Sequence, residues 1–151
     1  MSNKLKIFLS GGMTGLTEEE ASYWRTQFKL KNVDNELYTF IDPSYLYTPT
    51  NNINQSYEKE AMEYDLYWVR RSDIIVVNFN SLSSIGTAQE LMLAHTLNKP
   101  IIGMIPEKNY SSLHPWYKEE CIKIFKYKNT EENLKNTITQ IYNYLWRFKN
   151  D

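Results

Sequence analysis

The segment from Ser84 to Asn98, SIGTAQELMLAHTLN, contains one acidic residue, Glu90. Thr87-Ala-Gln-Glu90 fits a capping box, in which the threonine bonds the backbone N–H of Glu90 and the carboxylate reaches back. The same arrangement would place the carboxylate in the first turn of a helix, where the helix dipole favours its ionised form. Composition alone leaves both interpretations of Glu90 open, a helix cap and a chemical group.

A second carboxylate, Asp65, lies in a helical pattern, YEKEAMEYDLYWVRR. It is four residues from both Ala61 and Val69, at the edge of the apolar stripe that they form. A charge at such an edge costs free energy unless it is paired or faces a cleft. Asp65 is therefore either a rim aspartate bonded to an arginine or the backbone, or a functional group.

Two serines, Ser83 and Ser84, precede the helical segment that contains Glu90. Helix capping is the commonest role of serine at this position. Hydroxyl groups at a helix start could also donate to a phosphate or a sugar hydroxyl of a ligand.

Four of the five glycines fall in two loops, Gly11, Gly12 and Gly15 in the first and Gly86 in the second. Glycine lets backbone N–H groups approach a ligand and lets the chain adopt a positive φ. A turn alone could need one glycine, but three within GGMTG exceed that need. The spacing fits neither the dinucleotide-binding motif nor the P-loop, so it gives no support for NAD or ATP.

The elements that would position these residues alternate along the chain. Short apolar runs, typical of strands covered on both faces, occupy 5–10, 37–42, 73–79, 100–105 and 122–127. Helical patterns begin at Thr17 and run over 56–71, 84–98 and 130–148, with a shorter one at 115–121. This alternation predicts a doubly wound α/β domain. With strand order 2-1-3-4-5 the two glycine loops would face one another at the topological switch point.

Composition narrows the class of protein. At 151 residues the chain fits a single domain spanning 1–151, and Cys121 is the only cysteine, so an intracellular, cytoplasmic protein without thiolate sites is expected. The net charge of −1 gives no electrostatic basis for binding nucleic acid, and no stretch is apolar enough to span a membrane. His95 and His114 are isolated, so no metal site is predicted. Small molecules or proteins are the expected partners.

Three segments together resemble the nucleoside 2-deoxyribosyltransferase family and its nucleotide N-glycosidase relatives. KIFLSGGMTG is similar to the family's first strand and glycine loop, and EYDLYWVRRSDIIVVNF to its aspartate-bearing helix and third strand. The most specific match is SIGTAQELMLAHTLNKPI, which has the G-T-x-x-E pattern and the K-P that precede the fourth strand. The resemblance implies a flavodoxin-like, parallel, five-stranded sheet of order 2-1-3-4-5.

The resemblance also implies roles for residues. Glu90 matches the nucleophile, and Asp65 matches the aspartate that protonates or orients the departing base. Ser84 lies six residues before the glutamate, where hydrolases of monophosphates carry a serine for the phosphate. The substrate-binding residues implied are Phe8, Gly11, Gly12, Met13, Ser84, Gly86 and Thr87.

Phe8 departs from the family pattern, which usually has a tyrosine whose hydroxyl holds the glutamate. Loss of one such donor corresponds to a rate effect of about tenfold to several hundredfold. Tyr45, Tyr47 or Tyr57, from or beside the polar segment 43–55, could replace it. That segment is expected to be either a flap or an ordinary surface loop.

The function expected from the resemblance is cleavage of the N-glycosidic bond of 2'-deoxynucleosides with transfer of the sugar to another base. Two alternatives remain open, an N-glycosidase of nucleoside 5'-monophosphates and a catalytically weak nucleotide-binding protein. Neither metal nor organic cofactor is needed for this chemistry. Family members complete each site from a neighbouring subunit, which implies a homo-oligomer and makes Ser111, Ser112 and His114 candidates.

Overall fold

The structure is a computed structural model that describes residues 4–13, 15–34, 36–46 and 55–149, without the side chains of 45–46 and 55–58. Its sheet has five parallel strands in the order β2-β1-β3-β4-β5. The strands are β1 (Leu5–Gly11), β2 (Tyr38–Ile41), β3 (Ile74–Asn78), β4 (Ile101–Pro106) and β5 (Lys123–Tyr127). This is the predicted flavodoxin-like fold, with each strand end within one residue of its predicted position.

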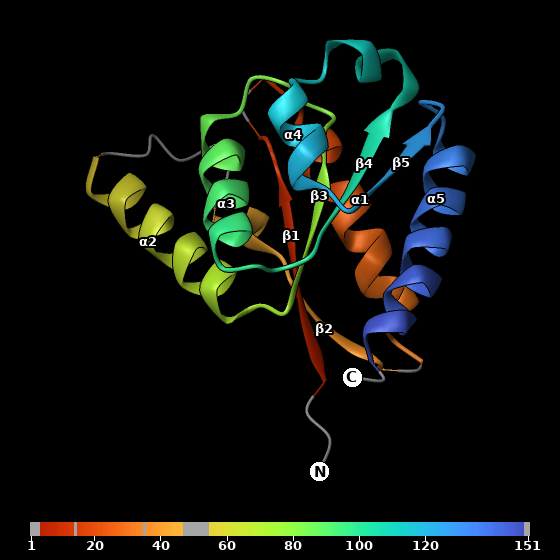
Figure 1. The fold of residues 1–151 in the computed structure, drawn as a ribbon, viewed down its shortest axis with the longest axis horizontal. Helices are drawn as coiled ribbons and strands as arrows, with labels where there is room; N and C mark the ends of the chain where they lie inside the picture. Colours follow the sequence, from red (N-terminus) through yellow and green to blue (C-terminus); the bar gives the residue numbers. More distant parts are fainter. Residues whose placement is uncertain (1–3, 14, 35, 47–54, 150–151) are drawn as a thin grey trace.

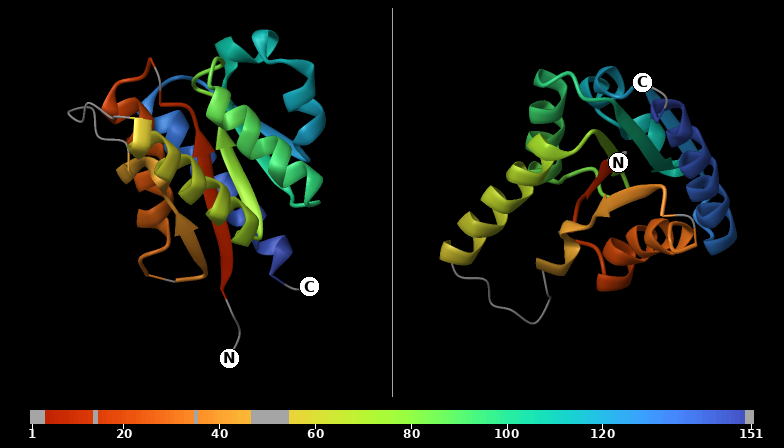
Figure 2. Two further views of the ribbon diagram at one scale, coloured as in Figure 1. Left: turned by 90° about the vertical axis from the view of Figure 1, so that its left-hand side faces the viewer. Right: turned by 90° about the horizontal axis from the view of Figure 1, so that it is seen from below.

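Helices cover both faces of the sheet. They are α1 (Glu18–Lys31), α2 (Gln55–Arg71), α3 (Ile85–Thr96), α4 (Pro115–Glu120) and α5 (Glu131–Tyr144), with 3-10 turns η1 (Pro43–Leu46), η2 (Glu107–Ser112) and η3 (Leu145–Phe148). Helices α1 and α5 lie on one side of the sheet and α2, α3 and α4 on the other (Figures 1 and 2). The predicted cap of α1 is present, because Thr17 and Glu20 form a complete capping box.

The strands alternate their side chains between two separate hydrophobic clusters, as the pleat requires. On β1, Ile7 and Leu9 belong to the cluster under α1 and α5, whereas Phe8 belongs to the cluster under α2 and α3. Ser10 follows Phe8 by two residues and is fully buried. Phe8 and Ser10 therefore both point to the side of the sheet that α2 and α3 cover, where the candidate functional residues are expected.

The short strand β2 leaves part of β1 without a strand partner. β2 pairs with β1 only from Leu5 to Phe8, whereas β1 continues to Gly11. The fully buried Arg25 of α1 covers this edge, donating from Nε to the Leu9 carbonyl and from Nη2 to the Gly11 carbonyl, both at 3.1 Å. Its Nη1 donates to the Ala21 carbonyl within the helix. The planar guanidinium thus fixes the end of β1, where the first glycine loop begins.

No helix within the described ranges is long and apolar enough to cross a lipid bilayer.

Candidate active site

A cleft opens at the carboxyl end of the sheet, where the chain leaves β1 toward α1 on one face and leaves the neighbouring β3 toward α3 on the other. Its main hollow has a volume of about 230 Å³ and is lined by Gly11, Met13, Pro43, Asp65, Ser84, Gly86, Thr87 and Glu90. A smaller hollow of about 140 Å³ adjoins it and shares Asp65, Gly86 and Glu90. We call these two hollows together the Glu90 cleft. Of the substrate-binding residues expected from the sequence, Gly11, Met13, Ser84, Gly86 and Thr87 line the main hollow, and Gly12 lies in the first glycine loop beside it.

The two glycine loops meet, as the predicted strand order requires. A Cβ atom built on Gly12 would lie only 2.9 Å from the Cβ atoms of both Ser81 and Ser84. Any larger residue at this position would push the loops apart. Gly15 serves a different purpose, since its φ of 81° lies in the left-handed region that favours glycine. Two of the glycines are therefore explained by packing and backbone geometry.

The capping box predicted for Thr87 and Glu90 is wrong. Helix α3 begins at Ile85, and its N-cap is Ser84, whose hydroxyl accepts the Thr87 N–H at 3.1 Å. Thr87 also donates its own hydroxyl to Ser84 Oγ at 2.9 Å. The serine cap, which the sequence offered as one alternative, is therefore confirmed, and Glu90 falls in the second turn of the helix. Because its carboxylate does not cap the helix start, it is free to face the cleft.

Glu90 is buried, with 8% of its surface exposed, and accepts a hydrogen bond from Ser10 Oγ at 2.7 Å. Burial, and after it the neighbouring Asp65 carboxyl, raise the pKa of Glu90 to about 8, against the opposing effects of the Ser10 hydroxyl and Arg25. A carboxyl group with this pKa holds its proton at neutral pH far more readily than an ordinary glutamate. Such behaviour is typical of catalytic acids and bases.

Asp65 is the second carboxyl group of the cleft. It lies on α2, is 7% exposed, and lines both hollows beside Glu90. The two side chains interact by charge and by hydrogen bonding. Two buried carboxyl groups in contact cannot both ionise easily, so the pair retains one proton over a wide pH range. The cleft therefore holds a carboxylate and a carboxylic acid side by side.

Arg25 adds a positive charge beneath this pair. Burial lowers its pKa to about 10, and the charges of Asp42, Glu90 and Asp65 oppose that shift. Its Nε lies 3.8 Å from Asp42 Oδ1, just after β2. An arginine with this pKa remains charged at neutral pH, so it partly offsets the negative charge of the carboxyl pair.

The start of α3 forms the wall opposite β1. Ser84, Gly86 and Thr87 line the main hollow, so hydroxyl groups and a helix N-terminus face it. Met13, from the first glycine loop, lines the same hollow. This wall is suited to binding the hydroxyl groups of a sugar or an anionic group.

The structure does not bring Phe8 into the cleft lining. Phe8 is fully buried in the α2 and α3 cluster with Val69, Ile75 and Leu91. The hydroxyl that bonds Glu90 comes instead from Ser10, two residues further along the same face of β1. Tyr47 and the side chains of Tyr45 and Tyr57 lie outside the described part of the chain.

The three neighbour-subunit candidates do not line the cleft of their own chain. Ser111 and Ser112 end η2, and His114 is the N-cap of α4, where its Nδ1 accepts the Trp116 N–H at 3.1 Å. Their role stays a prediction, since it concerns a second copy of the chain.

Sequence reasoning missed Ser10 and Arg25. Ser10 could have been found from strand periodicity, because it shares a face with Phe8 and comes at the end of the strand nearest the ligand side. Arg25 lies four residues after Ala21 and next to Trp24, on the buried stripe of α1. Across the described residues, no three histidine, cysteine, aspartate or glutamate side chains gather as a metal site.

Comparison with known proteins places the fold. No protein-family model and no curated protein sequence matches the chain. Among solved structures, a conserved protein from Enterococcus faecalis V583 aligns with a TM-score of 0.63 at 14% identity, covering 92% of this chain and 99% of the other. A 2-deoxyribosyltransferase from Bacillus psychrosaccharolyticus aligns with a TM-score of 0.63 at 19% identity, covering 80% and 85%.

A third structure, the CMP N-glycosidase of Clostridium botulinum, aligns with a TM-score of 0.55 at 16% identity, covering 90% of this chain and 98% of that one. The structural neighbours of this chain thus include a deoxyribosyltransferase and a nucleotide N-glycosidase, in agreement with the family that its motifs resemble.

Proposed function

We propose that this protein cleaves the N-glycosidic bond of 2'-deoxynucleosides and transfers the deoxyribose to another base. The observation that carries the proposal is the buried Glu90–Asp65 carboxyl pair, which faces a cleft and has the Ser10 hydroxyl bonded to Glu90. The fold shared with a 2-deoxyribosyltransferase and a CMP N-glycosidase supports the same class of reaction.

The proposed chemistry uses the pair with its single proton. The ionised Glu90 oxygen attacks the anomeric carbon while the bond from that carbon to the base nitrogen breaks. In the reactive arrangement the proton that the pair shares lies on Asp65 rather than on Glu90, and it passes to the departing base, which leaves neutral. The product is a glycosyl ester on Glu90. An incoming base then attacks the same carbon, returns its proton to Asp65 and releases the Glu90 carboxylate.

Two further groups support this division of labour. Ser10 donates to Glu90 Oε1 and so fixes the carboxylate for attack. Arg25 favours ionisation of the pair, which keeps the nucleophile available despite its burial. Ser10 thereby supplies the hydroxyl that the resemblance would place at position 8.

A second candidate function is hydrolysis of nucleoside 5'-monophosphates. It is favoured by Ser84, Gly86 and Thr87, because the main hollow extends from Glu90 to the start of α3. A helix N-terminus with hydroxyl side chains is a common binding site for phosphate. Water would then replace the acceptor base in the second step.

One experiment separates these functions. The protein is incubated with deoxynucleosides plus a free acceptor base, and separately with deoxynucleoside monophosphates, and the products are resolved by chromatography. Base exchange supports the transferase, and release of base from the monophosphate alone supports the hydrolase. Binding of nucleotides without turnover, detected as a rise in melting temperature, would replace both with the nucleotide-binding alternative.

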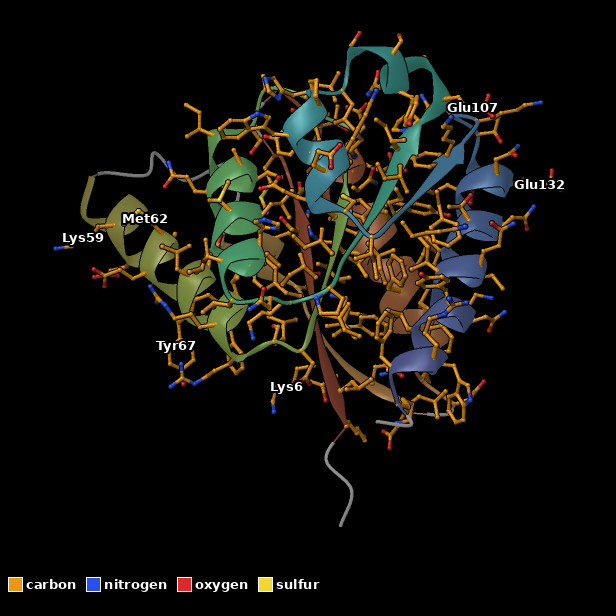
Figure 3. The ribbon with its side chains drawn as sticks, in the orientation of Figure 1. Lys6, Lys59, Met62, Tyr67, Glu107 and Glu132 are labelled. Atoms are coloured by element: carbon orange, nitrogen blue, oxygen red, sulfur yellow. The ribbon has the colours of Figure 1, made fainter. Side chains whose placement is uncertain are left out.

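We also propose that the active protein is a homo-oligomer in which His114, Ser111 or Ser112 of a neighbour completes the cleft. Apolar side chains beside the cleft are exposed, Met62 by 48% and Ile85 by 74%, and Met62 is seen on α2 in Figure 3. Sedimentation gives the subunit number. Mixing inactive Glu90→Gln with an inactive His114→Ala variant should restore activity if sites are shared, and should restore none if each chain acts alone.

A further inference from the structure

A second cavity lies on the opposite face of the sheet from the Glu90 cleft. It has a volume of about 310 Å³ and is formed where the ends of β3, β4 and β5 meet α1 and α5. Figure 3 labels Glu107, directly after β4, and Glu132, in the first turn of α5, at this same end of the molecule. We call this space the Trp24 cavity. Its volume is at the lower end of the range for small-molecule sites.

Most polar groups in its walls already have partners. Asn78 Oδ1 accepts the Tyr127 hydroxyl at 3.0 Å, and Asn109 Nδ2 donates to the Phe79 carbonyl at 3.2 Å. Asn80 Nδ2 donates to the Glu20 carbonyl at 3.1 Å. These bonds orient the three asparagine side chains in the walls of the cavity.

Two buried polar atoms of the lining residues have no hydrogen-bond partner among the described residues, Trp24 Nε1 and Asn80 Oδ1. Trp24 is only 1% exposed. One of these atoms is a donor and the other an acceptor, and leaving a buried polar group without a hydrogen bond is unfavourable. A ligand that satisfies both must offer an acceptor and an N–H or O–H donor.

The charge of the lining selects further. Glu19, Glu20 and Glu131 contribute three carboxylates against one cation, Lys108. Phosphates and carboxylates are therefore disfavoured, whereas neutral or cationic molecules are accepted. Tyr23, Trp24 and Tyr127 add aromatic surface, which suits a planar ring.

We propose that the Trp24 cavity is a second binding site, separate from the Glu90 cleft, for small uncharged heterocyclic amides. The ring carbonyl of such a molecule accepts from the Trp24 indole N–H, and its ring N–H donates to Asn80 Oδ1. Because both atoms are covered by the walls, binding includes a small rotation of these side chains. The recognition depends only on the walls of this cavity, so it stands whether or not the Glu90 cleft has the proposed activity.

The test follows the indole N–H resonance of Trp24 by nuclear magnetic resonance in the intact protein, with Trp24→Phe used to assign it. Uracil and 2-pyridone are the probes, since each is uncharged and has a ring carbonyl beside a ring N–H. Both should shift the resonance in a saturable way, with a dissociation constant on the order of 1 mM or tighter for ligands of this size. Orotate, which is uracil with a carboxylate, should bind more weakly than uracil by about tenfold or more. Absence of any shift would mean that water alone serves the two atoms and would overturn the proposal.

Two variants locate the bound probe. Asn80→Leu removes the acceptor and should weaken binding about tenfold or more, whereas Glu90→Gln should leave it unchanged. The reverse pattern would place the probe in the Glu90 cleft and would also overturn the proposal. A failure of the proposed catalytic function shows only in turnover assays, so the two outcomes are distinguishable.

Discussion

The Glu90 cleft and the Trp24 cavity lie at the same end of one sheet, yet their carboxyl groups are held in opposite ways. In the cleft, burial and the Asp65 carboxyl raise the pKa of Glu90. In the cavity, the Thr17 backbone N–H lowers the pKa of Glu20, and the Tyr23 hydroxyl and then Lys135 lower that of Glu131. The first arrangement keeps a proton available, and the second keeps carboxylates ionised.

The difference shows that the size of a hollow does not indicate its chemistry. The larger hollow, at about 310 Å³, has carboxylates suited to capping and to selecting ligands by charge. The main hollow of the Glu90 cleft is smaller, at about 230 Å³, and has the carboxyl pair that can attack and donate a proton. Burial and pairing of the carboxyl groups therefore distinguish the candidate reaction site from the candidate binding site.

The sharpest way to break this comparison is to make the same change in both regions. Glu90→Gln should lower the rate of glycosidic cleavage by about 10³-fold or more, because it removes the nucleophile. Glu20→Gln should leave the rate within about twofold and lower the melting temperature slightly, since it weakens an exposed capping box. Steady-state assays on both variants check this, and equal losses would contradict the assignment of Glu90.

The hydroxyl of Ser10 gives the next largest effect. Ser10→Ala should lower kcat by about tenfold to a hundredfold, on the scale of one lost donor to the reacting carboxylate. The matched control is Ser72→Ala, another fully buried serine whose hydroxyl donates to the Trp68 carbonyl at 2.6 Å. That variant should lose stability but keep its rate, so similar kcat losses would point to a structural role for Ser10.

Phe8 offers a further test of the same hydroxyl. Phe8→Tyr, made in the Ser10→Ala background, should recover part of the lost rate, since both side chains point to the same side of β1. In the wild-type background the added hydroxyl should bring little gain and lower stability. If Phe8→Tyr accelerates the wild type as much as the Ser10→Ala variant, the two hydroxyls are independent and the inferred substitution of one for the other is wrong.

The pH profile tests the shared proton. Because the pKa of Glu90 is raised to about 8, the singly protonated pair persists up to that pH and is lost above it. We expect kcat/KM to fall about tenfold per pH unit once the pH exceeds this value. A rate that continues to increase through pH 9 would show that no proton of the pair is needed.

Stability should change with pH in the direction that the raised pKa dictates. Glu90 has a pKa near 4.5 when unfolded and about 8 when folded, so the folded state binds more protons between these values. The free energy of unfolding therefore decreases as pH rises from about 4.5 to 8. Glu90→Gln should remove a burial cost on the order of 1–3 kcal/mol at pH 8 and very little at pH 4.5. Urea unfolding of both proteins at the two pH values measures this, and a pH-independent difference would contradict the shift.

The sequence predicted the fold well because its apolar runs are short, β-branched and regularly separated by helical patterns. The strand order also predicted that the two glycine loops meet beside the start of the helix with Glu90, and the family resemblance added Asp65, Met13 and Ser84 to that region. The sequence left the cap of α3 undecided because Ser84 and Thr87 are both good caps, and local spacing cannot rank them. The outcome depends on where the loop after β3 meets Gly12, which is a tertiary contact.

Ser10 and Arg25 escaped prediction for related reasons. An arginine in an acidic amphipathic helix is expected to lie on the surface. Its burial follows only from the shortness of β2, which has four residues and leaves the end of β1 without a strand partner. A serine at the end of a strand is expected to begin a turn, and its role as a donor becomes clear only once the facing carboxylate of Glu90 is known. The roles of both residues depend on hydrogen-bond partners that lie 14 and 80 residues away in the sequence.

Because Arg25 of α1 covers the free edge of β1, the geometry of the site depends on the docking of α1 against the sheet. Ser10 and Gly11 belong to the sheet, but their final position depends on α1 docking, because no strand holds that edge of β1. Partial undocking of α1 would dismantle the cleft while β3 and β4 remain paired. We therefore expect activity to be lost at a lower urea concentration than the protection of the β3 and β4 amides from hydrogen exchange. Loss of both at the same urea concentration would refute this.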